Sequence, residues 1–285
     1  MQKQSVCDKI KQKQWKLGGK PMLTELFSRE KIEYFSSLEY SDCRVIRPDI
    51  IAREDFTPRS VIIYLIPYYA GATVNISKYA AARDYHIYVR ELNSRLIAEL
   101  KSRYPENSFK GYGDSSPIDE RMAALSAGLG ILGDNGLLIN EKYGSYVFVA
   151  EIISDLAPEV LGASVPQAPK HCSSCGLCKR HCPTGHLENK CSECLSSITQ
   201  KKGDLSVDEV QIMRKCGTVW GCDVCQDVCP HNKNPKITPI SFFLEDRIGE
   251  LSDEVIAAMD KTTFSERAFS WRGRKTVERN LEYLK

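Results

Sequence analysis

The stretch CSSCGLCKRHCPTG runs from Cys172 to Gly185 and spaces four cysteines as Cys-x2-Cys-x2-Cys-x3-Cys-Pro. A second stretch, WGCDVCQDVCPHN from Trp220 to Asn232, adds three more as Cys-x2-Cys-x3-Cys-Pro. The chain has 12 cysteines in 285 residues, and most of them lie in this block. A chain of this length buries a large core without cross-links, so its stability does not require the thiols. The cysteines therefore serve a local chemical purpose.

The first stretch has the spacing with which bacterial two-cluster ferredoxins bind [4Fe-4S] clusters. Three thiolates two residues apart wrap three corners of one cubane, and the cysteine before proline is directed to the other cluster. One cluster is then held by Cys172, Cys175, Cys178 and Cys229, and the second by Cys182, Cys222 and Cys225. Zinc is disfavoured because zinc sites usually pair two Cys-x2-Cys units without this crossover. The spacing predicts two [4Fe-4S] clusters rather than zinc or unliganded buried cysteines.

The second cluster still lacks one ligand, since two clusters need eight thiolates and the two stretches supply seven. Cys191, Cys194 and Cys216 are the remaining cysteines of the block. Cys216 stands at the end of a helix expected over Ser206–Cys216, where a core position suits it equally well. Spacing alone leaves Cys191 and Cys194 open as the eighth ligand.

Composition and charge limit the class of protein. The chain is 42% hydrophobic and 27% charged, which is ordinary for a globular protein, and its net charge of +2 excludes a globally basic nucleic-acid binder. Met1–Lys20 is polar and has no secretory signal, and the apolar stretch Val61–Ala72 is too short to cross a membrane. We expect a cytoplasmic protein without a membrane partner. Cys7 and Cys43 are expected to be ordinary thiols.

The first half of the chain has the patterns of a mixed domain. Arg59–Pro67 contains the apolar run VIIYLI and predicts a buried strand, and Ser145–Ser154 predicts another. Tyr79–Arg103 has apolar residues at three- and four-residue spacing and predicts a long helix. Met22–Leu38 reads as an amphipathic helix that begins near Pro21. These elements predict an α/β (α+β) domain.

Proline-rich residues 157–170, APEVLGASVPQAPK, predict a linker after this domain. We therefore expect the α/β domain over residues 1–168, a bacterial-ferredoxin-like two-[4Fe-4S] domain over 169–235, and a short helical tail over 236–285. From Lys261 to Lys285 the tail has seven Lys or Arg and three Asp or Glu, beside Phe269 and Trp271. Basic side chains among aromatics suit a phosphate backbone with exposed bases, and they equally suit an ordinary solvated helix face.

A ferredoxin-like block moves single electrons and does no chemistry on an organic substrate, so the first domain must hold a second redox centre or a docking surface for one. Five segments together resemble the epoxyqueuosine reductases, cobalamin-dependent iron–sulfur enzymes that finish queuosine synthesis on tRNA. The segments are KYAAARDYH (Lys78–His86), GDSSPIDERMAALSAGLGILGDNGLLIN (Gly113–Asn140), the two cysteine stretches, and CLSSITQKKG (Cys194–Gly203).

This resemblance implies a first domain that binds cobalamin beside the clusters. It implies reduction of epoxyqueuosine to queuosine in tRNA, with electrons from an external one-electron donor of the flavodoxin or ferredoxin type. We expect the chain to act as a monomer. Full-length members carry a C-terminal helical repeat region, so the chain is expected to be a short form.

The resemblance also implies roles for two residues. The eighth cluster cysteine of the family begins a Cys-x-Ser segment, which here is Cys194. The family's proposed proton donor is the Asp of an Asp-x-x-Pro segment, which here is Asp114 before Pro117. Taken by itself, an Asp between Gly113 and Ser115 is first of all a turn or N-cap residue. As a proton donor it would need a raised pKa, which burial against a corrin ring can supply.

Contacts to cobalamin are assigned by the same resemblance. The candidates are Tyr85, His86, Gly133, Asn135 and Ser196. Asp134 departs from the family pattern, because a lysine is expected at its position and an anion stands there instead.

Two other functions remain open from the sequence. A corrinoid-dependent reductase of a small molecule would bind a corrinoid but would not retain tRNA. A non-catalytic two-cluster electron-transfer protein would hold clusters without a corrinoid and would be indifferent to Asp114→Ala.

Overall fold

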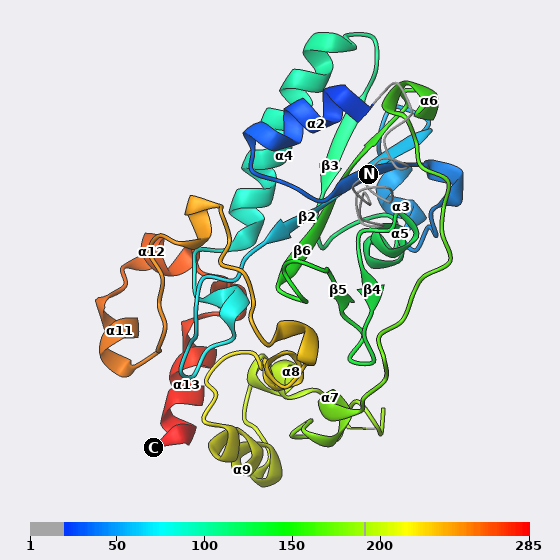
Figure 1. The fold of residues 1–285 in the computed structure, drawn as a ribbon. Coiled ribbons are helices and arrows are strands. Elements are labelled where there is room, and N and C mark those ends of the chain that lie inside the picture. Colours follow the sequence, from blue (N-terminus) through cyan, green and yellow to red (C-terminus); the bar gives the residue numbers. More distant parts are fainter. Residues whose placement is uncertain (1–19, 191) are drawn as a thin grey trace, which may run out of the picture. The chain divides into compact units, whose positions relative to one another are not determined.

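A computed structural model describes residues 20–190 and 192–285 (Figure 1). Cys7, expected to be an ordinary thiol, and Cys191, one of the candidates for the eighth ligand, lie outside the described residues. In chain order the elements are α2 (Lys20–Arg29), β1 (Phe35–Glu39), η1 (Tyr40–Asp42), α3 (Pro48–Ile51), β2 (Ser60–Pro67), η2 (Lys78–Ala80), α4 (Tyr85–Arg103), β3 (Phe109–Tyr112), α5 (Glu120–Ser126), β4 (Ile131–Leu132), β5 (Leu138–Ile139), β6 (Val147–Ser154), α6 (Pro158–Leu161), α7 (Leu177–Arg180), α8 (Leu195–Thr199), α9 (Val207–Cys216), α10 (Val224–Asp227), η3 (Pro230–Asn232), η4 (Ser241–Phe243), α11 (Asp253–Ala258), α12 (Lys261–Ser265), η5 (Ser270–Arg272) and α13 (Arg274–Leu284).

Four strands form one sheet in the order β1-β2-β6-β3, and β4 pairs with β5 in a second, two-stranded sheet. β1 and β2 are antiparallel, with Phe35 opposite Tyr64, and β3 and β6 are antiparallel, with Tyr112 opposite Glu151. All eight residues of β2 are buried, as the apolar run VIIYLI predicted. Strands mixed with helices in this way confirm the α/β (α+β) class.

The helix predicted over Met22–Leu38 was wrong in its second half. α2 ends at Arg29, and Phe35–Glu39 forms the edge strand β1. The Phe35 ring stacks on Phe27 with centroids 4.6 Å apart, so the apolar residues that continued the helical pattern face the core from a strand. Pairing with β2, which lies far along the chain, outweighs the local helical periodicity.

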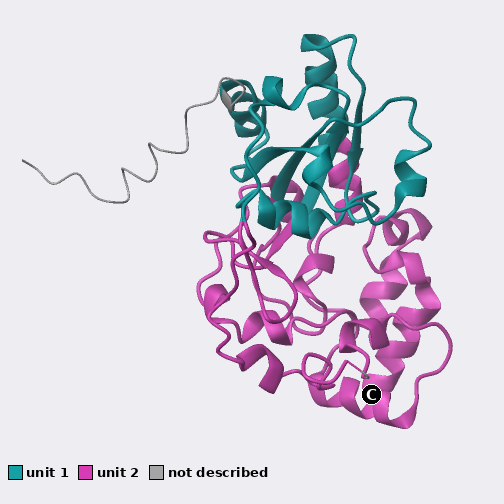
Figure 2. Cartoon of the chain, turned by 90° about the vertical axis from the view of Figure 1, so that its right-hand side faces the viewer, with its two compact units in different colours: residues 1–65, 92–129, 149–167 teal, residues 66–91, 130–148, 168–285 magenta. Residues whose placement is uncertain are grey.

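The chain divides into two compact units (Figure 2). Unit 1 consists of Met1–Leu65, Leu92–Leu129 and Val149–Gln167, and unit 2 of Ile66–Glu91, Gly130–Phe148 and Ala168–Lys285. Each unit draws on three stretches of chain. The division into functional domains over 1–168, 169–235 and 236–285 stays a prediction.

Unit 1 has an apolar core under the sheet. Leu92, Leu96 and Leu100 of α4 are fully buried at four-residue spacing. Next to them, Tyr64 Oη donates a 2.6 Å hydrogen bond to Asn93 Oδ1. A Cβ on Gly111 would lie 2.4 Å from Asn93 Cγ, so only glycine lets β3 approach the helix this closely.

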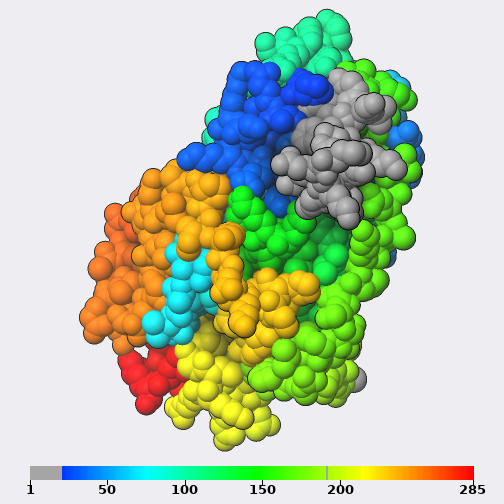
Figure 3. Space-filling view, viewed as in Figure 1, coloured from blue at the N-terminus to red at the C-terminus, as the bar shows by residue number. Residues whose placement is uncertain are grey.

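Unit 2 contains the cysteine block and the tail. One apolar cluster gathers around the fully buried Trp220 and includes Leu251 and Phe264 of the tail. From α13, Asn280 Nδ2 donates hydrogen bonds to Thr199 O at 2.7 Å and to Val219 O at 2.8 Å. Figure 3 shows the red tail beside the yellow segment that carries α9. The tail thus folds together with the cysteine block. Within the described residues, no helix has the length and apolar character needed to cross a membrane.

Candidate functional site

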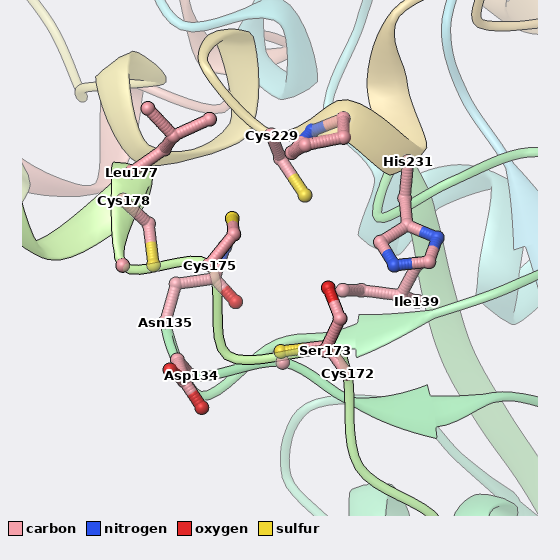
Figure 4. A pocket seen from close by; sticks show the side chains of 13 residues that line it. Asp134, Asn135, Ile139, Cys172, Ser173, Cys175, Leu177, Cys178, Cys229 and His231 are labelled. Atoms are coloured by element: carbon pink, nitrogen blue, oxygen red, sulfur yellow. The ribbon is translucent and has the colours of Figure 1, made fainter.

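Four cysteines from the two stretches surround one hollow of unit 2. Cys172, Cys175, Cys178 and Cys229 line a cavity of about 360 Å³, including space open to solvent, and their sulfur atoms lie around the same space (Figure 4). Cys229 thus joins the three cysteines of the first stretch, the grouping that the crossover spacing predicts. The donor set fits a [4Fe-4S] cluster, whose four irons each take one thiolate.

Backbone hydrogen bonds fix these cysteines from both sides. Cys172 N donates to Leu132 O of β4 at 2.9 Å, and Cys229 N donates to Gln226 O at the end of α10 at 3.1 Å. Between Cys175 and Cys178, Gly176 has φ +73° and is the N-cap of α7. This left-handed conformation favours glycine, which allows the tight loop.

The cysteines of the predicted second cluster also gather in unit 2. Burial first, and then the neighbouring Cys194 thiol, raise the pKa of Cys222 to about 12. Burial, and then Cys222 and Cys194, raise the pKa of Cys225 to about 12. Iron must displace these protons when it binds, so cluster assembly here releases protons. Of the open candidates for the eighth ligand, Cys194 lies beside both Cys222 and Cys225.

Cys182 and Cys216 lie near each other in the region of the predicted second cluster, and Cys216 also lies near Cys222. Burial would raise the pKa of the Cys182 thiol, but hydrogen bonds from the Leu187 N–H, from the Thr184 hydroxyl and N–H and from the His186 N–H outweigh it and lower the pKa. Such N–H donors stabilise a thiolate and hence a metal ligand. Within the described ranges, no three His, Cys, Asp or Glu side chains converge on a point where one metal ion would sit.

Two carboxylates inside the second cysteine stretch bind the KYAAARDYH segment. Asp223 accepts hydrogen bonds from Ser77 Oγ at 2.6 Å and Lys78 N at 2.7 Å. The Lys78 ammonium lies 2.7 Å from Asp227 Oδ1 and 3.5 Å from Asp223 Oδ2. Burial alone would lower the pKa of Lys78, but the two carboxylates outweigh it and raise the pKa. Lys78 is therefore a buried cation that links the two matched segments.

The end of the second stretch is held by Asn232. Its Oδ1 accepts the Ser145 N–H at 2.9 Å, and its Nδ2 donates to Ser145 Oγ at 2.8 Å. A Cβ on Gly144, which has φ +61°, would lie 1.9 Å from Asn232 Oδ1. The glycine is required for this contact, which anchors the chain just after Cys229.

The candidate cobalamin contacts fall into separate groups. Tyr85 stacks on Phe148 with centroids 4.0 Å apart and on His86 at 4.1 Å. His86 Nδ1 lies 2.8 Å from an Asp84 carboxylate oxygen. Ser196 Oγ accepts a hydrogen bond from Gln200 Nε2 at 3.2 Å. All of these residues belong to unit 2.

Gly133 and Asn135 instead line the cavity of the four cysteines. Asn135 Nδ2 is buried and has no hydrogen-bond partner among the described residues. The same side chain lies next to the Cys225 thiol and lowers its pKa, against the larger raising effect of burial. Asn135 therefore reaches cysteines of both predicted clusters.

Asp134, which departs from the family pattern, is paired within the block. Its Oδ1 accepts a hydrogen bond from Ser174 Oγ at 3.1 Å, and its Oδ2 lies 3.6 Å from the Lys179 ammonium. A cation is thus present near this position, and it comes from the cysteine stretch.

Asp114 lies in unit 1, in a turn before α5. It is exposed and has φ +66°, the left-handed region that non-glycine residues rarely adopt. Its N–H donates to Glu120 Oε2 at 3.2 Å. The N-cap of α5 is Asp119, whose side chain accepts the Met122 N–H at 3.1 Å. Asp114 is therefore a turn residue and does not cap the helix.

Sequence reasoning missed two acids in unit 1, Glu120 and Glu151. Glu151 lies in the middle of β6 and is 0% exposed. A charged residue within the apolar segment VFVAEIIS was the available indication, since Glu is almost never fully buried without a partner.

Most arginines of the tail donate hydrogen bonds to backbone carbonyls of unit 2. Arg267, 7% exposed, donates to Asp246 O at 2.6 Å, and Arg274 donates to Met259 O at 2.6 Å. Arg279 donates to Lys201 O at 2.8 Å. Trp271, by contrast, is 58% exposed and carries the Arg272 guanidinium 3.7 Å above its ring.

Two family models match the chain. Residues 171–232 match the family model of a 4Fe-4S double cluster binding domain, and residues 56–115 match that of Epoxyqueuosine reductase QueG. An epoxyqueuosine reductase from Cyclobacterium marinum is 31% identical over 245 residues, which cover 80% of this chain and 76% of that protein. The chain belongs to the epoxyqueuosine reductase family.

A second epoxyqueuosine reductase, from Listeria monocytogenes, is 30% identical over 279 residues, covering 90% of this chain and 70% of that protein. The fold also agrees with a crystal structure of an epoxyqueuosine reductase with an epoxyqueuosine-modified tRNA stem loop. The TM-score is 0.74 at 23% identity, over 94% of this chain and 81% of that one. The epoxyqueuosine reductase fold therefore extends over nearly the whole chain.

Proposed function

We propose that this chain reduces epoxyqueuosine to queuosine in tRNA, with two [4Fe-4S] clusters and cobalamin as cofactors. The observation that carries the proposal is the four-cysteine cavity, in which Cys229 joins Cys172, Cys175 and Cys178, in a member of the epoxyqueuosine reductase family. A solved relative holds an epoxyqueuosine-modified tRNA stem loop, which supports tRNA as the substrate.

The two ligand sets follow the crossover spacing. Cys172, Cys175, Cys178 and Cys229 would hold one cluster, and Cys182, Cys194, Cys222 and Cys225 the other. When bound, the clusters and cobalamin would carry single electrons from an external donor to the epoxide-bearing ring. The segments that carry the cysteines position these ligands. The contacts of Asp223 and Asp227 with Lys78 fix the second of these segments.

The net reaction removes one oxygen. The epoxide takes up two electrons and two protons, both C–O bonds break, an alkene forms and water leaves. Asp114 donates a proton to the departing oxygen. Its exposed carboxyl on a turn of unit 1 is accessible to a bound substrate. Tyr85, His86, Gly133, Asn135 and Ser196 are the proposed cobalamin contacts, and the rings of Tyr85 and Phe148 are both half-buried.

The test incubates anaerobically reconstituted protein with cobalamin, a reductant and epoxyqueuosine-containing tRNA, followed by mass spectrometry of the nucleosides. We expect queuosine to form, and Asp114→Asn to abolish its formation. Asp49→Asn, a surface acid in α3 of the same unit, is the matched control and should leave turnover unchanged. Intact clusters and bound corrinoid without conversion would instead indicate a reductase of small molecules. Clusters without corrinoid binding would indicate an electron-transfer protein.

A further inference from the structure

Glu151 occupies an apolar position. The side chain points from β6 into the core of unit 1, where Ala150, Ile152 and Ile153 beside it are also 0% exposed. Both of its carboxylate oxygens are fully buried. An ionised carboxylate in such a place is strongly unfavourable, and a buried acid normally responds by keeping its proton.

The polar side chains that approach Glu151 are those of Glu120 and Ser116. Burial, and then the Glu120 charge, raise the pKa of Glu151 well above its ordinary value. Burial first, and then the Asp114 charge, raise the pKa of Glu120 to about 7. The two carboxyls therefore titrate as a pair, and the more deeply buried one holds its proton longer.

Four other titratable groups act on the pair. Asp114 and Asp119 act on Glu120 from the turn and from the start of α5. The Cys43 thiol and the Tyr112 hydroxyl act on Glu151, from the segment after η1 and from the neighbouring strand β3. All four groups are neutral or negative. The hydrogen-bond donor between the Glu151 and Glu120 carboxyl groups is therefore a proton on Glu151.

Glu120 connects the pair to the proposed proton donor. Its Oε2 accepts the Asp114 N–H at 3.2 Å, and Asp114 holds a left-handed backbone. That conformation costs a non-glycine residue about 1 kcal/mol. A charged acceptor makes a stronger hydrogen bond to an N–H than a neutral one does. An ionised Glu120 thus stabilises the strained turn.

We propose that Glu151 is a buried carboxylic acid that donates its proton in a hydrogen bond to the Glu120 carboxylate, which makes Glu120 the positioning residue for the Asp114 turn. This inference rests on the proposed function, because the conformation of the Asp114 turn affects turnover only if Asp114 is the proton donor. Glu120 then accepts from both neighbours at once, from Glu151 Oε–H on the core side and from the Asp114 N–H on the solvent side.

Infrared spectroscopy of the reconstituted protein, labelled with 13C-glutamate, tests the proton directly. At pH values above the Glu120 pKa of about 7, we expect a labelled carboxylic acid band in the wild type and its loss in Glu151→Gln. Glu99→Gln, an exposed residue of α4, is the matched control and should keep the band. Absence of the band in the wild type, or its persistence in Glu151→Gln, would overturn the proposal.

Turnover then tests the positioning role. Gln at 151 still donates a hydrogen bond to Glu120, so Glu151→Gln should retain turnover, whereas Glu151→Met, which lacks a donor, should reduce it. Turnover of the wild type should rise with pH as a group with a pKa near that of Glu120 ionises. This rise should be absent in Glu120→Gln. Equal turnover in Glu151→Met and Glu151→Gln would refute positioning. The infrared result needs neither substrate nor cobalamin, so a failure of Asp114→Asn to abolish turnover would reject the proposed function and leave the proton assignment standing.

Discussion

The Lys78 ammonium lies 2.7 Å from the Asp227 carboxylate, and this ion pair joins the KYAAARDYH segment to the end of α10, between Cys225 and Cys229. The Lys78 side chain is only 11% exposed, and it also contacts the buried Asp223. Lys78 is thus the shared cation of Asp223 and Asp227, the two carboxylates of the second cysteine stretch. Removing that lysine leaves Asp223 buried beside a second negative charge without a cation to balance the two.

Lys78→Met is therefore expected to destabilise the protein by about 3 kcal/mol, because a buried charge loses its partner. Asp227→Asn should cost roughly 1 kcal/mol, since Asp227 is half exposed and Lys78 keeps Asp223. Denaturant unfolding of the anaerobically reconstituted variants measures both values. If Lys78→Met proved no more damaging than Asp227→Asn, the buried ion pair would have no structural role.

The eighth cluster ligand is tested by single serine substitutions at the three remaining cysteines of the block. Cys194 lies beside Cys222 and Cys225, so Cys194→Ser should lose one of the two clusters. Cys216→Ser and Cys191→Ser should keep both. Iron and sulfide analysis with electron paramagnetic resonance gives the cluster content. Loss of a cluster in Cys216→Ser, with Cys194→Ser intact, would reassign the ligand to Cys216, which lies near Cys182.

Asn135→Leu should lower a cluster reduction potential. The buried Nδ2 has no partner among the described residues and faces the cavity of the four cysteines, where a bound cluster offers sulfur acceptors. Hydrogen bonds to cluster sulfur raise the potential. A bond of about 1 kcal/mol corresponds to about 40 mV for one electron. Redox titration followed by electron paramagnetic resonance measures the shift. Ser173→Ala, an exposed residue at the same cavity, is the control, and an equal shift there would exclude a specific Asn135 contact.

Folding stability should fall as the pH rises from about 4.5 toward 7. The pKa of Glu120 is raised from 4.5 to about 7, so the folded state binds more protons than the unfolded state in this range. Glu120 therefore contributes stability that is fully present below its unfolded pKa and is lost as the pH rises through its folded pKa. The contribution is at most about 3 kcal/mol. Unfolding free energies measured across this range should show the slope in the wild type and a flatter profile in Glu120→Gln; parallel profiles would contradict it.

Features encoded locally were predictable from the sequence. β2 follows from its apolar run, and the four-cysteine cavity follows from spacing, because both depend on residues close together in the chain or on a fixed ligand geometry. The strand Phe35–Glu39 was not predictable, since its pairing partner β2 is remote. Nor was the Glu120–Glu151 contact, which joins a helix start to a strand centre. The internal carbonyl partners of Arg267 and Arg274 are equally remote, so charge counting overstated the basic surface of the tail.

The exposed Trp271, with the half-buried Arg272 guanidinium over its ring, remains as the tail surface that fits tRNA. Stacking of a base on an aromatic ring contributes about 1–3 kcal/mol, so Trp271→Ala should weaken tRNA binding at least several-fold. Arg272→Ala should also reduce the slope of log affinity against log salt by about 1, as expected for one phosphate contact. Lys261→Ala, another exposed cation in the tail, is the matched control for charge alone. Filter binding of epoxyqueuosine-containing tRNA over a salt series measures these effects. If Lys261→Ala lost as much affinity as the other two variants, the tail would attract tRNA only through its general charge.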